Sequence, residues 1–259
     1  MSLTRCWGLA ENGESVEVAV VPQLFDRVVD LWPPVGLTRF DRPSDRVTAR
    51  FGLSDTWMIV PDTEASGDNP SQAAWDRLEA ELELFSVKRL ERLVPVHAAA
   101  IAWNGQVVMV PGVSGAGKST LAFAASKVGA QVLSDEFTLI DPSTGLVTGW
   151  PRPVRMKRDG EIQRLHLAEP AEPLPVGLLA LVQHNGEVGC DWHDISSADA
   201  VIGLLNNALS TRTRPGATMD AAVAVARSAR AIAGHRSEAA QAVTELLGLL
   251  INGNGSRPS

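Results

Sequence analysis

The chain has 259 residues, of which 45% are hydrophobic and 20% charged, so it is long enough for one large domain or two smaller ones with buried cores. Its net charge of −7 argues against a general binder of nucleic acids or membrane surfaces, because both need a positive field to meet phosphate. Cys6 and Cys190 lack the spacing of metal ligands, which predicts free thiols in a reducing compartment. With no secretory pattern at the start and no apolar run of ~18 residues, a cytoplasmic protein is expected.

Residues 1–68 predict a small β-rich N-terminal domain. Three apolar runs have the character of strands, at residues 16–21, 47–53 and 57–60, and prolines and aspartates separate them. No recognisable chemical motif falls in this region.

A helix is predicted within residues 69–93. Asn69 can cap it, and Pro70 stands at the first helical position. Large apolar side chains then recur at three- and four-residue spacing: Trp75, Leu78, Leu82 and Phe85. The stripe indicates packing, and we expect this helix to link the N-terminal domain to the next one.

Residues 94–251 predict an α/β domain with a sheet of mixed strand direction, and residues 252–259 predict a disordered tail. The expected strands are 96–103 and 106–110 around a turn at Asn104-Gly105, 130–134, the hairpin 138–140 with 146–148, and the hairpin 178–183 with 187–192. The expected helices are 118–127, one from Ser196 or Ser197 towards Leu209, 218–232, and one from Ser237 to about Leu250.

A glycine-rich loop joins the strand of residues 106–110 to the helix of residues 118–127. Its residues 112–119, Gly-Val-Ser-Gly-Ala-Gly-Lys-Ser, match G-x-x-x-x-G-K-[ST] at every fixed position. Glycines let backbone N–H groups close on phosphate oxygens, and the helix N-terminus adds partial positive charge. The strand before and the helix after disfavour a chance match.

This loop predicts binding of a nucleoside triphosphate, as a co-substrate, together with Mg²⁺. Lys118 can reach the β- and γ-phosphates, and the Ser119 hydroxyl can ligate the metal. The residues expected to bind the nucleotide are Gly112, Ser114, Gly115, Ala116, Gly117, Lys118, Ser119 and Thr120.

An acidic pair, Asp135 and Glu136, closes the strand of residues 130–134. A carboxylate at the end of a neighbouring strand faces the same crevice as the loop, so both acids are candidate Mg²⁺ ligands with Ser119 and candidate catalytic groups. Neighbours in a strand point to opposite faces, and Asp135 is therefore preferred as the catalytic base. The alternative is a solvated turn.

The order of motifs suggests a family. A lone histidine in an apolar strand, such as His97, is more often a core residue than a catalyst. Here, however, a histidine, a tight hairpin, a phosphate loop, a helix and an acidic pair follow one another. This order resembles the catalytic domain of HPr kinase/phosphorylase, whose nucleotide site is similar to that of phosphoenolpyruvate carboxykinase. The resemblance rests on Val96-His97-Ala98-Ala99, residues 112–120 and Leu133-Ser134-Asp135-Glu136.

The resemblance implies a kinase that phosphorylates a serine-type hydroxyl, and relatives often form homo-oligomers. In it, His97 would contact the phosphates or the loop, Lys118 and Ser119 would handle phosphate and Mg²⁺, and Asp135 would deprotonate the acceptor. Glu136 stands where the family has a second aspartate. The chain is most similar to HPr-kinase-related proteins that act on peptides or small molecules.

A basic cluster follows the hairpin of residues 138–148. Phosphoryl transfer needs cations over the developing charge, and Arg152, Arg155, Lys157 and Arg158 could supply one. In relatives, a basic strand at this point lies near the nucleotide, so Arg155 is the preferred member. The alternative is a solvated basic turn.

These features predict an ATP- and Mg²⁺-dependent kinase that transfers the γ-phosphate to a hydroxyl of a peptide, protein or small molecule. Adenine is favoured over guanine because the sequence has no Asn-Lys-x-Asp motif. The alternative is a nucleotide-binding regulatory module with little or no turnover. Neither nucleic acid nor a membrane is expected as a partner.

Overall fold

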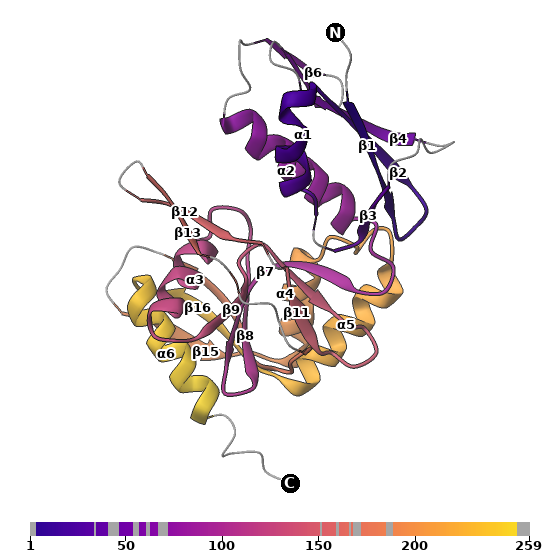
Figure 1. Cartoon of the computed structure of the whole chain (residues 1–259). Helices are drawn as coiled ribbons and strands as arrows, with labels where there is room; N and C mark the ends of the chain where they lie inside the picture. The colour runs from indigo at the N-terminus through magenta and orange to yellow at the C-terminus, as the bar shows by residue number, and fades with distance from the viewer. Residues whose placement is uncertain are drawn as a thin grey trace. The chain divides into compact units, whose positions relative to one another are not determined.

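The computed structural model divides the chain into two compact units, residues 1–91 and residues 92–259 (Figure 1). The residues that it describes are 4–33, 35–40, 47–53, 57–60, 63–66, 72–150, 152–158, 161–165, 167, 172–184 and 189–252.

The first unit is built on a sheet with the strand order β3-β1-β2-β4-β5-β6. Its strands are β1 (Thr4–Ala10), β2 (Ser15–Val20), β3 (Leu37–Phe40), β4 (Val47–Leu53), β5 (Trp57–Val60) and β6 (Thr63–Ser66). The pairing is antiparallel except between β2 and β4. The strands expected near residues 16–21, 47–53 and 57–60 are confirmed, whereas β1, β3 and β6 were not predicted.

Helices η1 (Pro22–Leu24), α1 (Phe25–Asp30) and α2 (Gln72–Val87) complete the first unit. The predicted apolar stripe of α2 is buried in the same core as Val16 and Val18 of β2. The Arg27 guanidinium of α1 lies 4.3 Å from the ring centroid of Trp75 in α2. The helix is therefore part of the N-terminal core and not a separate linker, and the boundary between the units falls after residue 91. The expected cap at Asn69 and Pro70 lies outside the described residues.

The second unit contains a mixed, open sheet with the order β11-β10-β7-β8-β14-β16-β15, and β9 also pairs with β7. Its strands are β7 (Val94–Trp103), β8 (Gln106–Pro111), β9 (Gln131–Ser134), β10 (Phe137–Ile140), β11 (Val147–Gly149), β14 (Val176–His184), β15 (Asp191–Asp194) and β16 (Arg230–Arg236). Strands β8, β14 and β16 run parallel, and the remaining pairs are antiparallel. The expected mixed α/β architecture is confirmed.

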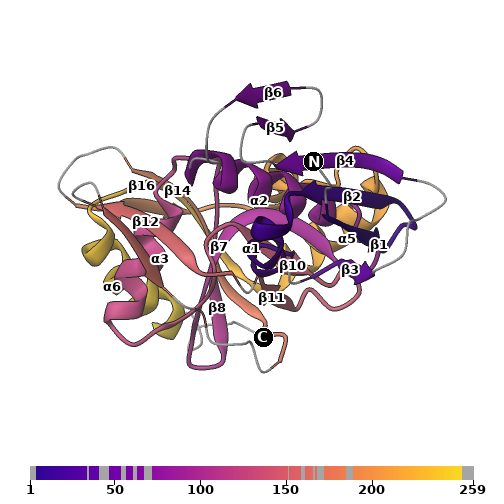
Figure 2. The same cartoon turned by 45° about the horizontal axis from the view of Figure 1, so that its top comes forward.

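Helices cover both faces of this sheet. Side chains alternate between the faces: Ala99 and Ile101 of β7 join the core under α3 (Lys118–Lys127) and α6 (Ala239–Asn252). Ala98 and Ala100 join the core under α4 (Ser197–Asn207) and α5 (Pro215–Ser228). Figures 1 and 2 show α3 beside α6, across β7 and β8 from α5. The result is three layers, helices, sheet and helices, as expected for a sheet buried on both faces.

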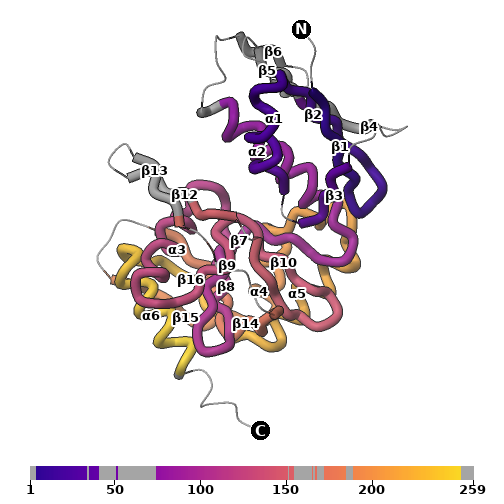
Figure 3. The backbone as a smooth tube through the Cα atoms, viewed as in Figure 1, coloured from indigo at the N-terminus to yellow at the C-terminus, as the bar shows by residue number. Residues whose placement is uncertain are grey.

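The tube in Figure 3 traces the local connections. The turn between β7 and β8 has positive φ at Asn104 (50°) and Gly105 (77°), as a type I′ turn requires. Helix α3 and the hairpin of β10 with β11 are confirmed, and Ser196 caps α4 as one of the two expected starts. A separate hairpin pairs β12 (Val154–Arg158) with β13 (Glu161–Leu165).

Two predictions for the C-terminal half are wrong. The helix expected over residues 218–232 ends at Ser228, and the chain continues as β16. The strands β14 and β15 do not pair with each other, because each pairs with β16. The alanine-rich run that ends in Ala231 and Ile232 fits a helix locally, but these two side chains are buried in a strand with sheet partners on both sides. Within the described residues, no helix is long and apolar enough to cross a membrane.

Candidate functional site

The glycine-rich loop runs from the end of β8 into the first turn of α3. Gly115 (φ 85°) and Gly117 (φ 80°) adopt left-handed conformations that other residues reach only with strain. The Lys118 ammonium donates to the carbonyl oxygens of Gly112 (2.8 Å) and Val113 (3.0 Å). Burial lowers the pKa of Lys118, and the nearby charges of Glu136 and Asp135 oppose that shift. The lysine thus lies across the loop, beside the backbone that would surround a phosphate.

The first turn of α3 contacts the acidic turn after β9. Ser119 donates its hydroxyl hydrogen to Oδ2 of Asp135, with 2.5 Å between the oxygens. Burial raises the pKa of Asp135, although the hydrogen bond from Ser119 acts in the opposite direction. A hydroxyl and a carboxylate side by side are the hard oxygen ligands that Mg²⁺ prefers, so the residues present fit this ion.

The acidic pair lies in a tight turn between β9 and β10, not within a strand. The buried Ser134 Oγ accepts hydrogen bonds from the backbone N–H groups of Glu136 and Phe137, both at 3.1 Å. The strand has therefore ended before Asp135, which removes the constraint that the two acids point to opposite faces.

His97 of β7 meets the second acid. Its Nε2 lies 3.4 Å from Oε1 of Glu136, and the side chains are 21% and 51% exposed. Burial acts to raise the pKa of Glu136, but the hydrogen bond and charge of His97, with Lys118, outweigh it and leave this pKa below its ordinary value. The backbone N–H of Gly112 also donates to the carbonyl oxygen of His97 (3.1 Å). The histidine thus touches both the acidic turn and the start of the loop.

The two neighbouring acids consequently differ in chemistry. Asp135 holds a proton more readily than an ordinary aspartate, and Glu136 holds one less readily than an ordinary glutamate. Environments that push two pKa values apart are characteristic of acid–base sites. The shift of the Asp135 pKa is in the direction that a catalytic base requires.

Arg236, at the end of β16, belongs to the site although it was not predicted. Its side chain is 3% exposed, and Nη2 donates to the Ala116 carbonyl oxygen (3.2 Å) while Nη1 donates to that of Ser237 (3.1 Å). Nε is buried and has no hydrogen-bond partner among the described residues. Burial lowers the pKa of Arg236. A buried cation with an unused donor beside the glycine-rich loop suits an anionic ligand.

Sheet topology explains why this arginine lies here. Strands β8, β14 and β16 are parallel, so their carboxyl ends meet at one edge of the sheet. The glycine-rich loop follows β8, and Arg236 follows the apolar residues of β16 at the same edge. A basic residue after a short apolar run was the available signal, but that run was assigned to a helix.

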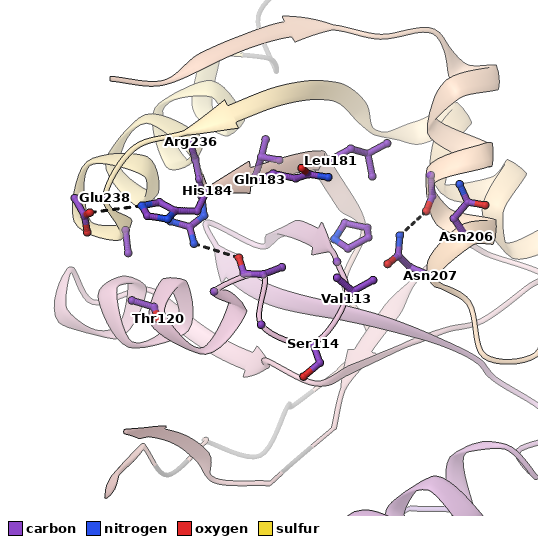
Figure 4. Close-up of a pocket in the computed structure, with 18 residues that line it drawn as sticks. Val113, Ser114, Thr120, Leu181, Gln183, His184, Asn206, Asn207, Arg236 and Glu238 are labelled. Atoms are coloured by element: carbon purple, nitrogen blue, oxygen red, sulfur yellow. Dashed lines mark hydrogen bonds and ion pairs between the residues drawn. The ribbon is translucent and has the colours of Figure 1, made fainter. Parts of the chain in front are cut away.

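A cleft of about 680 Å³ opens beside the loop (Figure 4). Six of the residues expected to bind the nucleotide line it: Gly112, Ser114, Gly115, Ala116, Gly117 and Thr120. Lys118 and Ser119 lie in the first turn of α3, directed to the carbonyls and to Asp135 as described above.

Arg155 lies in β12, opposite Arg164 of β13, and its side chain is outside the described residues, as are those of Lys157 and Arg158. Its expected role at the nucleotide therefore stays a prediction. Arg152 is half-buried, and Pro151 before it lies outside the described residues.

No protein-family model matches the chain, and a search of curated proteins found no significant match.

Proposed function

We propose that this protein is an ATP- and Mg²⁺-dependent kinase of the P-loop, HPr-kinase-like type. It transfers the γ-phosphate to a hydroxyl of a peptide, protein or small molecule. The observation that carries the proposal is the contact between Ser119 and Asp135, which joins the phosphate loop to a carboxylate with a raised pKa. A module that only binds nucleotide needs the loop but no base beside it.

The phosphate chain would bind along the loop. Backbone N–H groups of the loop and the N-terminus of α3 supply partial positive charge, and Lys118 adds a full charge once it exchanges its two carbonyl contacts for phosphate oxygens. The Ser119 hydroxyl and the acidic turn would hold Mg²⁺, which would neutralise charge on the phosphate oxygens.

Transfer requires a base for the acceptor hydroxyl. The Asp135 carboxylate would take the hydroxyl proton as the acceptor oxygen bonds to the γ-phosphorus, and the bond from that phosphorus to the bridging oxygen of ADP breaks. Glu136 stays ionised beside His97 and maintains negative charge near Lys118. His97 would thereby orient the acidic turn relative to the loop.

Two substitutions test this proposal. Lys118→Ala is expected to abolish MgATP binding, because it removes the ammonium that lies across the loop. Asp135→Asn is expected to bind MgATP within a few-fold of the wild type and to lower phosphoryl transfer by about 10²–10⁴, the usual contribution of a general base.

The measurement is incubation with Mg²⁺ and γ-labelled ATP, alone and with extract of the source cell, followed by quantification of labelled products. Asp220→Asn, an exposed aspartate on α5, serves as the matched control for loss of a carboxylate and should keep the wild-type rate. Full activity in Asp135→Asn would remove the base from the mechanism. Nucleotide binding with neither transfer nor hydrolysis in the wild type would favour the regulatory module.

A further inference from the structure

The cleft beside the loop is separate from the acidic turn. One wall is the loop itself, and the other is formed by the end of β14, the last turns of α4, and the segment from Arg236 into α6 (Figure 4). Asp135, Glu136 and His97 are not among its lining residues. Its volume of about 680 Å³ lies within the range of small-molecule sites.

The order of the strands indicates which way the phosphate chain of a bound nucleotide would run along the loop. β9, which leads to the acidic turn, pairs with β7, whereas the cleft lies against β14, and β8 with its loop stands between β7 and β14. If the γ-phosphate meets Asp135, as the proposed function requires, the other end of the chain points towards β14. The cleft is therefore where the nucleoside would lie, an inference that rests on the proposed function.

The lining of the cleft matches a purine base. Leu181 of β14 and Pro111 offer apolar surface for a ring, and amide side chains of β14 and α4 stand beside them: Gln183, Asn206 and Asn207. Figure 4 shows Asn207 between α4 and the loop residue Val113. A flat apolar ring with polar edges needs this combination of surfaces.

A hydrogen bond within α4 determines the orientation of the Asn207 side-chain amide. Nδ2 of Asn207 donates to the carbonyl oxygen of Gly203, at 2.8 Å, so the nitrogen end of the amide is occupied. The oxygen end has no hydrogen-bond partner among the residues that the structure describes. The cleft therefore presents an acceptor held in place, because rotating the amide would set two oxygens against each other.

We propose that this cleft is the nucleobase subsite and that Asn207 selects adenine by accepting a hydrogen bond from its exocyclic 6-amino group. Guanine and hypoxanthine carry a carbonyl oxygen at that position. This oxygen would face the Asn207 oxygen with no hydrogen between the two acceptors. A site built to receive a hydrogen bond discriminates against ligands that lack the donor, because its own polar group is then left unpaired.

Calorimetric titration of the full chain with Mg²⁺ and three ligands tests the proposal. ATP should bind about tenfold more tightly than ITP, which carries a carbonyl in place of the 6-amino group and a hydrogen on N1, a ratio typical of one hydrogen bond. Asn207→Leu should lower ATP affinity to that for ITP and leave tripolyphosphate affinity unchanged. Gln241→Leu, which removes an exposed amide of α6 bonded to Glu245, is the matched control and should retain the preference for ATP.

The outcomes separate this inference from the proposed function. Equal affinity of the wild type for ATP and ITP, or a preference for ATP that survives Asn207→Leu, overturns the assignment of Asn207 while leaving phosphoryl transfer intact. Failure of the wild type to bind either ATP or tripolyphosphate overturns both. The comparison of ATP with ITP needs no variant, so it decides the question even if Asn207→Leu does not fold.

Discussion

Replacing Gly117 with alanine tests whether the phosphate loop and Arg236 depend on each other. Gly117 precedes α3 with φ at 80°, and a Cβ built there would overlap Nη2 of Arg236. Arg236 is buried and cannot swing into solvent without leaving its contacts. The substitution therefore strains the backbone and displaces the guanidinium.

The magnitude follows from two terms. An L-residue in the left-handed region costs roughly 1–2 kcal/mol. Loss of the hydrogen bond from Arg236 to the Ala116 carbonyl oxygen costs about 1.5–3 kcal/mol, as for bonds that involve a charged group. Together they give about 2.5–5 kcal/mol, which corresponds to roughly two to almost four orders of magnitude in MgATP affinity, because the nucleotide requires the native loop.

The assay is calorimetric titration with MgATP, with denaturant unfolding to check the fold. Gly115→Ala is the matched control: φ is 85°, but an added Cβ would meet nothing within 4 Å, so only the backbone term of roughly 1–2 kcal/mol is expected. In an Arg236→Ala background, Gly117→Ala should cost no more than Gly115→Ala. Native affinity in Gly117→Ala, or equal losses in the two single glycine variants, would refute the reasoning.

Two further predictions concern stability. Leu82→Ala, in the fully buried face of α2, should lower the free energy of unfolding by about 2–5 kcal/mol in denaturant titrations, whereas a helix that only linked two domains would show little change. Asp194 accepts two hydrogen bonds from Arg230 (2.7 and 3.1 Å), which hold the pKa of Asp194 below its ordinary value. The contribution of this pair to the stability of the fold is therefore complete above the pKa of an unfolded aspartate. It is lost as the pH falls through the pKa of the folded state. Asp194→Asn should therefore cost under about 1 kcal/mol at neutral pH, as for an exposed pair, and the difference from wild type should vanish in acid; a difference that persists there would contradict the assignment.

Local patterns predicted the parts of the site that are close in sequence. The loop of residues 112–119 needs glycines for its left-handed turns, and the strand before it and the helix after it are where the structure has them. The Asn104-Gly105 turn likewise carries its own conformational requirement. The loop and the turn can be predicted from the sequence because the residues that require the unusual backbone conformation are the same residues that take it.

The C-terminal half shows where local patterns fail. Residues 218–232 are alanine-rich and suit a helix, yet Ala231 and Ile232 lie in a strand between β14 and β15. The pairing of the strands depends on how their side chains are buried between the helices on the two faces of the sheet. A short stretch of sequence does not carry this information. Because this strand was predicted as a helix, the position of Arg236 at the edge of the sheet was not predicted either.

The sequence by itself determined the glycine-rich loop, the acidic pair that follows it, and a mixed α/β architecture, because glycine stereochemistry and hydrophobic periodicity act over a few residues. Only the tertiary structure decided that Asp135 contacts Ser119, that His97 contacts Glu136, and that Arg236 lies behind the loop. The tertiary structure also shows a cleft on the β14 side of that loop. These relations arise from strand order, which brings together residues as far apart as Ala116 and Arg236 at one edge of a sheet.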